Sequence, residues 1–480
     1  MSAPCGLITD FYELTMVQGY YLEENYPEVV FDLFYRSQPF GSGFAIFAGL
    51  QDALEGIRNF TFSSEDIDYL RSLGNFRESF LTYLKDFRFT GDIYAMDEGS
   101  VVFPGEPLVR VHGNLIEAQL IESYLLNVIN FQSLIATKSA RVVNASGGGK
   151  VIEFGLRRAQ GLDGAMSATR AAYIGGVAGT SNTLGGKRFG IPVMGTMAHS
   201  WVMAYPDELE SFRRFAGIYP DTAILLIDTY DTLNSGLKHA ITVGKELKKQ
   251  GKRLGVRIDS GDLSYLSKKV RKALDAEGLY DALITVSNDL NEEIIHQLVA
   301  ERSPIDAWGV GTNLVTGGSQ AAMNGVYKLS AKKNGGAFVP TMKLSNHVEK
   351  TTNPGIKQVF RFFSGSEALG DLIILEEEGP LKIGEPYTFN HPLVEHQRFI
   401  MRKQRYTYLK QMLQKKMESG TVLEHPTLEE IRTHAQEGLA SLDDTYKRII
   451  NPHIYKVSIS DRLKELKGEM IHQFRKEFQQ

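Results

Sequence analysis

The spacing of apolar residues changes character near residue 150. Before that point, residues 9–21 and 115–140 have the spacing of helices, whereas residues 29–36 alternate as expected for a strand. The polar stretch Ser63–Asp66 is typical of a helix start. The first part of the chain therefore predicts a mixture of helices and strands.

From residue 151 onward, short apolar runs alternate with helix-like segments. The runs cover residues 151–154, 191–195, 223–227, 255–258, 282–286 and 307–310. Helical spacing fills several of the intervals, for example residues 232–250 and 265–277. Repeated strand–helix units predict a parallel sheet covered by helices. We expect a (β/α) barrel rather than an open sheet, because no unit carries a nucleotide-binding fingerprint of the open-sheet kind.

After residue 345 the pattern loosens. Residues 353–357, Asn-Pro-Gly-Ile-Lys, predict a loop-rich junction, and after Ile400 the spacing predicts mostly amphipathic helix. Thr427 and Glu430 have the spacing of a capping box, which marks a helix start. The charges of this region indicate solvated helix faces rather than a binding surface.

Composition narrows the class of protein. With 480 residues, 42% of them apolar and 23% charged, the chain can form one or two full globular domains and a smaller one. The net charge of -4 provides no general attraction to nucleic acid or to an anionic membrane. The single cysteine, Cys5, excludes an internal disulfide and a cysteine-based zinc site. Without a signal-peptide pattern or a membrane-length apolar run, we expect a cytoplasmic enzyme.

Polar residues follow each of the six apolar runs. The segments are Gly155–Arg158, Thr196 with His199, Asp228–Asp231, Asp259–Asp262, Ser287–Asp289 and Gly311–Asn313. Any one of them is explained as a turn or a helix cap. Six in succession, with Arg, His and Asp recurring, favour a shared active site, because parallel strands end at one rim.

Candidate phosphate and ion-pair sites differ in strength. Gly147–Lys150 and Gly185–Lys187 lack the spacing and the hydroxyl of a Walker A loop, so we interpret them as turns. Gly309–Thr312 follows an apolar strand directly, and its glycines would let backbone N–H groups approach a phosphate. Arg257 and Asp259 lie on one face of their strand, either as a structural ion pair or as part of an active site.

His199 lies where the predicted strand 191–195 leaves the sheet. The sequence around it contains neither an HExxH motif nor a second histidine, which argues against a metal site. Two interpretations remain from the residues alone. His199 is either a hydrogen-bonded core residue or a group that takes part in chemistry.

Several motifs, in order, resemble those of nicotinate phosphoribosyltransferases. The matching stretches are Thr9–Met16 (TDFYELTM), Glu153–Arg158 (EFGLRR), Gly195–Ser200 (GTMAHS), Asp228–Thr232 (DTYDT), Gly255–Asp262 (GVRIDSGD), Gly311-Thr312, Lys343–Ser345 (KLS), and the tail from Asn451-Pro452-His453 to Val457–Ser460. Because they span nearly the whole chain, the sequence is identified as a member of this family.

The resemblance implies an α/β fold with two parts. One is an irregular (β/α) barrel of the type II phosphoribosyltransferase kind, expected in residues 136–345. The other is an α/β sandwich built from residues 1–135 and part of residues 346–480, which are mostly helical at the end. It also implies a homodimer with shared active sites.

The implied reaction is the first step of NAD salvage from nicotinate. Nicotinate, phosphoribosyl diphosphate, ATP and water give nicotinate mononucleotide, pyrophosphate, ADP and phosphate, with Mg²⁺ as cofactor. His199 matches the histidine that the family phosphorylates.

The resemblance also distributes roles among residues. It implies His199 and Asp259 for catalysis; Tyr12 (from the neighbouring protomer), Phe154, Arg157, Ser181, Thr196 and Arg257 for nicotinate; Arg141, Asp262, Ser287, Asn288, Gly311, Thr312 and Thr316 for the phosphoribosyl and phosphate groups; and Asp259 and Asp262 for Mg²⁺.

Three alternatives are weighed against this hypothesis. Nicotinamide enzymes of the superfamily carry an acidic residue after a Gly-Thr pair, where this chain has Ser181; a hydroxyl can donate to nicotinate, which a carboxylate would repel. Quinolinate phosphoribosyltransferases are shorter, so the long C-terminal region argues against them. A (β/α) barrel lyase or isomerase acting on a sugar phosphate would use His199 as a general acid or base.

Overall fold

The computed structural model describes residues 6–345, 350–423 and 426–477, so Cys5 lies outside the described residues. The chain forms two compact units. The first comprises residues 1–134 and 322–480, and the second comprises residues 135–321. Residues 322–345, expected in the barrel segment, therefore fall in the first unit.

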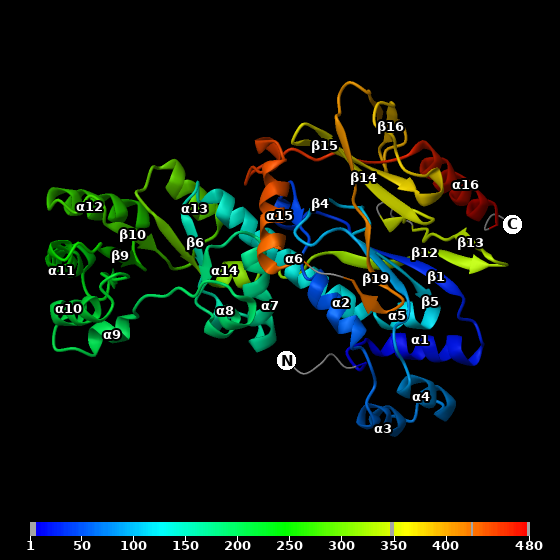
Figure 1. Ribbon diagram of the computed structural model, residues 1–480, viewed down its shortest axis with the longest axis horizontal. Coiled ribbons are helices and arrows are strands. Elements are labelled where there is room, and N and C mark those ends of the chain that lie inside the picture. The colour runs from blue at the N-terminus through cyan, green and yellow to red at the C-terminus, as the bar shows by residue number, and fades with distance from the viewer. Residues whose placement is uncertain (1–5, 346–349, 424–425, 478–480) are drawn as a thin grey trace. The chain divides into compact units, whose positions relative to one another are not determined.

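A six-stranded parallel sheet forms the centre of the second unit. Its strands, in spatial order, are β7 (Gly179–Thr180), β6 (Lys150–Glu153), β11 (Ala307–Val310), β10 (Leu283–Val286), β9 (Gly255–Ile258) and β8 (Ile224–Leu226). Between the strands lie α7 (Gly161–Ile174), α8 (Thr183–Phe189), α9 (His199–Met203), α10 (Glu208–Ile218), α11 (Leu237–Lys249), α12 (Leu263–Ala276), α13 (Glu292–Ala300) and α14 (Thr312–Val315). The predicted alternation of parallel strands and helices is confirmed (Figure 1).

The predicted strand 191–195 is wrong. Only Val193 forms a bridge, to Thr180, and Pro192 has no N–H to donate to a ladder. Within residues 135–321, all of which are described, no pairing joins this segment to β8. The predicted α/β class with an irregular barrel is confirmed, and the irregularity lies at this opening.

The first unit contains two larger sheets and one pair of short strands. One sheet has the order β13 (Ala337–Pro340), β12 (Gly325–Asn334), β1 (Glu28–Tyr35), β5 (Val109–Asn114), β3 (Asp92–Ala95), β19 (Gln414–Glu418) and β20 (Thr421–Val422). The other has the order β17 (Arg398–Met401), β16 (Tyr387–Asn390), β21 (Val457–Ile459), β15 (Glu367–Leu375), β14 (Lys357–Ser364) and β18 (Tyr408–Gln411), while β2 (Ala45–Ile46) pairs with β4 (Val101–Val102). The first of these sheets therefore combines strands from both ends of the chain, whereas the second is built from residues 357–459 alone.

The helices of the first unit are α1 (Phe11–Leu22), α2 (Leu50–Arg58), α3 (Ser64–Ser72), α4 (Glu78–Lys85), α5 (Leu115–Leu120), α15 (Leu428–Ala440) and α16 (Asp461–Glu477), and α6 (Glu122–Ala145) crosses the unit boundary. The predicted helices near residues 9–21 and 63–66 are confirmed, and the predicted helix 115–140 is two helices that meet at Ile121. The capping box of Thr427 and Glu430 is confirmed, with both reciprocal bonds present.

The expectation of mostly helix after Ile400 is wrong for the stretch that forms β18, β19 and β20. These strands are short and rich in Lys, Gln and Tyr, so few apolar residues mark their alternation. Met417, which is fully buried, is one of the few that do. Their pairing with β14 and β3 supplies the strand conformation that the local pattern hides.

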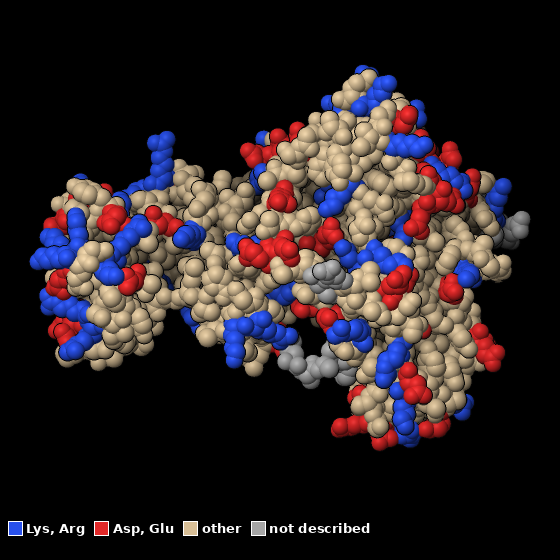
Figure 2. Space-filling model, in the orientation of Figure 1, with Lys and Arg blue, Asp and Glu red and all other residues tan. Residues whose placement is uncertain are grey.

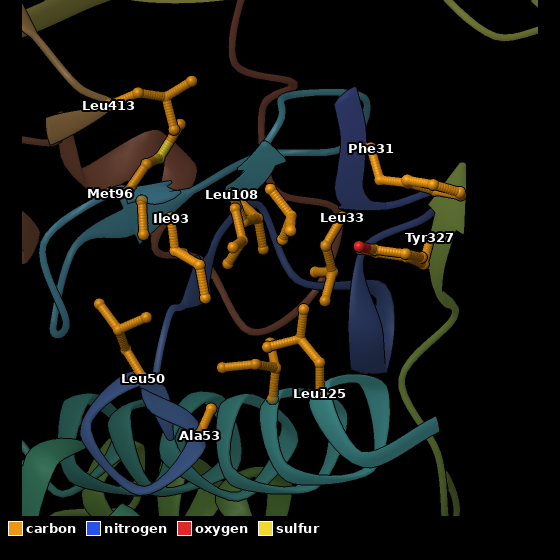
Figure 3. Packing of buried hydrophobic residues seen from close by; sticks show 14 of the residues in the cluster. Phe31, Leu33, Leu50, Ala53, Ile93, Met96, Leu108, Leu125, Tyr327 and Leu413 are labelled. Atoms are coloured by element: carbon orange, nitrogen blue, oxygen red, sulfur yellow. The ribbon is translucent and has the colours of Figure 1, made fainter. Parts of the chain in front are cut away.

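The main core of the first unit lies between helices and strands from distant parts of the sequence. Figure 3 shows Leu50 and Ala53 of α2 and Leu125 of α6 pointing toward Ile93 of β3 and Leu33 of β1. All five side chains are buried. Their burial removes apolar surface from water, which is the largest favourable contribution to folding.

The charged surface offers no single-sign face in the view of Figure 2, where Lys and Arg are interspersed with Asp and Glu over both units. This agrees with the small net charge of the chain. Among the described residues, no helix combines the length and the apolar character needed to cross a membrane.

Candidate active site

The candidate site lies at the carboxyl ends of the parallel strands in the second unit. Phe154 follows β6, Ser181 follows β7, Asp259 follows β9 and Ser287 follows β10. Because all these strands are parallel, their following residues emerge at one edge of the sheet, as the sequence predicted.

Arg257 connects three of the predicted residues. From β9, its Nε donates to Ser287 Oγ at 2.8 Å and one terminal nitrogen donates to Thr196 Oγ1 at 2.9 Å. The other terminal nitrogen donates to Asp259 Oδ1 at 2.8 Å. The guanidinium carbon also lies 5.7 Å from the centre of the Phe154 ring. A planar fork with several donors suits this arrangement, whereas a lysine would not reach all partners.

The Asp259 carboxylate is held in its ionised form. Burial opposes ionisation, but a hydrogen bond from Ser287 and the charge of Arg257 outweigh it and lower the pKa of Asp259. The side chain keeps 30% of its surface exposed. It therefore presents a fixed negative charge to anything bound at the strand ends.

His199 begins α9, and its two ring nitrogens have different surroundings. Nδ1 lies 3.1 Å from Thr229 Oγ1, and Nε2 lies 3.8 Å from Asp259 Oδ2. With 41% of its side chain exposed, His199 is not a core residue. The structure thus favours the second of the two interpretations left open by the sequence.

Asp228, which we did not select from the sequence, supports this arrangement. Its Oδ2 accepts hydrogen bonds from the Asp259 N–H at 3.0 Å and from the Ser260 hydroxyl at 2.6 Å. Its Oδ1 is buried and has no hydrogen-bond partner among the described residues. The sequence contained a signal for this role, because Asp228 and Thr229 follow a buried apolar run. It did not show which groups the two side chains would contact.

Two positions near Phe154 are so closely packed that a residue larger than glycine would not fit without movement. A Cβ on Gly309 would lie 2.6 Å from the Phe154 ring, and one on Gly311 would lie 3.1 Å from the Phe154 carbonyl oxygen. A side chain at position 309 would displace the ring, and one at position 311 would press against the backbone of Phe154. Packing against Phe154 is thus sufficient to explain the glycine at position 309, and the phosphate cradle of Gly309–Thr312 stays a prediction.

Ser181 sits above a buried polar network. The Glu153 carboxylate, fully buried at the end of β6, accepts hydrogen bonds from the hydroxyls of Thr180 at 2.5 Å and Thr169 at 3.1 Å. The Ser181 N–H donates to the Glu153 carbonyl oxygen at 2.9 Å. These bonds place Ser181 and Phe154 on the ends of adjacent, paired strands.

Other predicted residues are engaged elsewhere. Arg141 is buried on α6 and donates to Glu292 Oε1 at 3.0 Å, while Lys138 lies 2.6 Å from the other oxygen. Asp262 caps α12 by accepting the Tyr265 N–H at 2.9 Å. Both arrangements are structural contacts that leave the predicted phosphate roles untested.

The remaining predicted residues lie on the surface or near it. Arg157 and Asn288 are exposed, and Asn288 has the left-handed φ of 100° that costs a non-glycine residue free energy. Thr316 Oγ1 donates to the Thr312 carbonyl oxygen at 2.7 Å. Tyr12 belongs to the first unit, on α1, with 49% of its surface exposed.

Only one carboxylate oxygen of Asp259 is available to bind Mg²⁺. Across residues 6–345, 350–423 and 426–477, no three or more His, Cys, Asp or Glu side chains gather as a metal site. Asp259 Oδ1 is already bonded to Arg257 and Ser287, which leaves Oδ2. This fits an ion held by one or two carboxylates together with substrate phosphates, which is the usual mode for Mg²⁺.

Comparison with known proteins decides the family. Residues 7–130 and 356–467 match the models described as the N-terminal and C-terminal domains of nicotinate phosphoribosyltransferase, and residues 149–361 match the model of the family itself. The chain belongs to the nicotinate phosphoribosyltransferase family. The resemblance inferred from the motifs is confirmed.

Relatives of this family cover nearly the whole chain. A nicotinate phosphoribosyltransferase of Bacillus subtilis is 42% identical, with 98% of this chain and 95% of that protein covered. The one of Caenorhabditis elegans is 39% identical over 95% of this chain and 92% of that protein.

Solved structures agree. The crystal structure of human nicotinic acid phosphoribosyltransferase superposes with a TM-score of 0.83 at 31% identity, covering 96% of this chain and 99% of that one. A nicotinate-nucleotide pyrophosphorylase of Pyrococcus furiosus shares the fold, with a TM-score of 0.70 at 22% identity over 91% and 95% of the two chains. Membership in the family removes the barrel lyase or isomerase as the leading alternative.

Proposed function

We propose that the chain catalyses the ATP-coupled condensation of nicotinate with phosphoribosyl diphosphate, as a cytoplasmic homodimer. The observation that carries the proposal is the bonded group of Arg257, Asp259, Ser287 and Thr196 at the strand ends of a family member. In the reaction, the ring nitrogen of nicotinate bonds to C1 of the ribose. The bond from C1 to the diphosphate oxygen breaks, and pyrophosphate leaves.

Nicotinate would bind between aromatic and cationic groups. Phe154 offers one face of its half-buried ring, and Arg257 beside it offers positive charge to the carboxylate. Ser181, on the neighbouring strand end, can donate a hydroxyl proton to the same carboxylate. Tyr12 from the second protomer and Arg157 would complete the pocket.

Asp259 would stabilise the sugar as its bond to the diphosphate breaks. The ribose then gains positive charge, and a carboxylate kept ionised by Ser287 and Arg257 favours that charge. Since the carboxylate is already oriented, little reorganisation is needed during the reaction. Mg²⁺, held by Asp259 with Asp262 and the substrate, would neutralise the phosphate charges.

The phosphate groups would lie along the other strand ends. We assign them to Ser287, Asn288, Gly311, Thr312 and Thr316, together with Arg141. Backbone N–H groups and hydroxyls at such strand ends are suitable donors to phosphate oxygens.

ATP coupling would proceed through His199. The Nε2 lone pair attacks the γ-phosphorus of ATP, and the bond from that phosphorus to the bridging oxygen breaks as ADP leaves. For this step the Nδ1–H group donates a hydrogen bond to Thr229 Oγ1, 3.1 Å away, and the lone pair is then on Nε2. Water later cleaves the phosphorus–nitrogen bond to give phosphate. The phosphoryl group, with roughly two negative charges, would change the affinity of the site for diphosphates.

The deciding assay measures pyrophosphate release from phosphoribosyl diphosphate and Mg²⁺ with nicotinate or with nicotinamide, each with and without ATP. We expect release with nicotinate, stimulation by ATP, and little release with nicotinamide. No release with nicotinate would overturn the proposal, and equal release with nicotinamide would overturn the role of Ser181.

A labelling experiment tests the phosphohistidine separately. Incubation with γ-labelled ATP should place acid-labile phosphate on the protein, and His199→Ala should abolish it. His296→Ala, at an exposed histidine of α13, is the matched control and should label normally. Labelling that persists in His199→Ala would place the phosphoryl group elsewhere.

A further inference from the structure

A second group of cations lies in the first unit, outside the residues assigned above. A cavity of about 840 Å³ opens between the β16–β17 hairpin and the segment that leads into β21. Its lining residues include the cations Arg398, Arg448 and Lys456, two histidines, and no Asp or Glu. The tail motif that begins at Asn451-Pro452-His453, which the proposed reaction does not use, forms one wall.

The cations of this cavity form no direct ion pairs among the described residues. Arg398 and Arg448 are exposed, and neither forms an ion pair within the described parts of the chain. Hydrogen bonds from the hydroxyl and N–H of Thr445, together with the charges of Lys447 and Arg448, lower the pKa of Asp443, so this exposed carboxylate lies near Arg448 without forming an ion pair with it. Lys456 faces the Phe399 ring at 4.9 Å rather than a carboxylate. Like charges gathered in this way repel one another unless an anion lies between them.

Neutral donors accompany the cations. His391 Nδ1 accepts the N–H groups of Leu393 and Val394, at 3.1 and 2.9 Å. A neutral ring in that state carries its proton on Nε2 and can donate it. Asn451 and Gln397 add side-chain amides to the lining. Donors of this kind can form hydrogen bonds with those oxygen atoms of an anionic ligand that the arginines do not contact.

The wall formed by the tail motif is fixed in place. The His453 ring stacks on Tyr446, with centres 5.2 Å apart and planes 9° apart, and the His453 N–H donates to Thr445 at 2.9 Å. Tyr455 is buried, stacks on Phe103 and donates to Asp371 Oδ1 at 3.0 Å. Asn451 is held at a left-handed φ of 51°. A rigid wall loses little conformational entropy when a ligand binds.

We propose that this cavity binds a small phosphate-bearing molecule. Its volume is within the range of about 300–1,000 Å³ typical of ligand pockets. Several cations at separate positions match a chain of phosphates better than a single carboxylate, and arginine forks bind phosphate through paired hydrogen bonds.

The test is titration calorimetry of the full chain in magnesium-free buffer, with tripolyphosphate and with ATP as probes. Arg398→Ala/Arg448→Ala should bind one equivalent of probe fewer than the unsubstituted chain, or bind it at least about tenfold more weakly for each cation removed. The control, Arg58→Ala/Arg462→Ala, removes the same charge from exposed arginines of the first unit outside the cavity and should leave binding unchanged.

The two probes separate the sources of the ligand. Equal binding of tripolyphosphate and ATP assigns the cavity to a phosphate chain, and loss of ATP binding alone assigns it to a nucleotide. Identical stoichiometry and affinity in the cavity variant and the control overturns the proposal. Lys456→Gln is a second variant with the same expectation if the double variant fails a circular-dichroism check of folding.

Discussion

The two ring nitrogens of His199 show how single contacts decide chemistry in this chain. Nδ1 lies within hydrogen-bond distance of Thr229 and Nε2 faces Asp259, so the ring is held in one orientation. Thr229 touches no reacting atom in our proposal. It is therefore a positioning residue, and its effect should appear in ATP coupling rather than in pentosyl transfer itself.

We predict that Thr229→Val lowers the stimulation by ATP by up to about tenfold, the size expected from losing one neutral hydrogen bond. Transfer from phosphoribosyl diphosphate without ATP should stay near the unsubstituted rate. The measurement is the ratio of initial rates with and without ATP, and Thr229→Ser, which keeps the hydroxyl, should restore the ratio. An unchanged ratio in Thr229→Val contradicts the positioning role.

Glu13 provides a second prediction at the residue scale, in the pH dependence of stability. Burial raises the pKa of Glu13 to about 7, and hydrogen bonds from Thr9, Ser123 and Tyr12 offset this only in part. Between the ordinary value of 4.5 and about 7, the folded chain keeps a proton that the unfolded chain has lost. By linkage, this contribution stabilises the fold most below pH 4.5 and declines as pH rises to 7.

Glu13→Gln should remove that contribution. From pH 5 to pH 8, the melting temperature of the unsubstituted chain should fall by about 2–4 °C more than that of the variant, the shift caused by roughly 1 kcal/mol in a large domain. Glu23→Gln, at the exposed end of the same helix, should follow the unsubstituted chain. Parallel pH curves for Glu13→Gln and the unsubstituted chain would contradict the assignment.

At the scale of elements, the opening in the parallel sheet is the main departure from a regular barrel. The segment from Ile191 to Met197 makes one bridge to β7 and none to β8. Side-chain hydrogen bonds from Arg257 replace part of the missing strand pairing, because Arg257 donates to Thr196 and also to the Met197 carbonyl oxygen at 3.4 Å. The Arg257 side chain, which extends from β9, therefore fixes the segment that leads to His199.

We predict that Arg257→Lys lowers kcat/KM for nicotinate by about 100-fold, because a lysine cannot hold Ser287, Thr196 and Asp259 together and misplacement by about 1 Å has that cost. The measurement is steady-state kinetics with nicotinate as the varied substrate. Arg253→Lys, at an exposed arginine before the same strand, should stay near the unsubstituted value. A loss below about threefold in Arg257→Lys would contradict the role of its fork.

At the scale of the whole molecule, the first unit is assembled from both ends of the chain. Arg361 of β14 and Asp371 of β15 form a buried pair through two parallel contacts, at 2.9 and 2.6 Å. Tyr455, near the C-terminus, donates to the same carboxylate. Burial and the Asp371 charge raise the pKa of the neighbouring Glu106 well above its ordinary value. This buried group thus joins residues that are about 350 positions apart in the sequence, from Glu106 to Tyr455. Removing one member of the ion pair would leave the other charge buried without compensation, which is costly.

We predict that Arg361→Met lowers the free energy of unfolding by about 3–5 kcal/mol, because the Asp371 charge is left buried without a cation beside it. Denaturant unfolding measures it. Arg462→Met breaks the exposed pair with Glu377 and should cost at most about 1 kcal/mol. Equal losses in the two variants would contradict the argument from burial.

The features that depend on neighbours along the chain can be predicted from the amino-acid sequence. Alternating apolar runs and helical spacing specify five of the six parallel strands of the second unit, all except β7. The motifs around Asp259 and His199 specify the family, because they too are read from local order. The sequence also predicts that the polar residues after these strands lie at one edge of the sheet, since the carboxyl ends of parallel strands share that edge.

Which of these residues contact one another depends on how the elements pack in three dimensions. Arg257 reaches Thr196 across the opening of the sheet, Arg141 turns to Glu292, and Asp228 supports the backbone of Asp259. The lysine-rich strands β18 and β19 are strands because distant partners pair with them. The physical reason is that hydrogen bonds and burial between residues far apart in sequence outweigh the local preferences that a sequence pattern records.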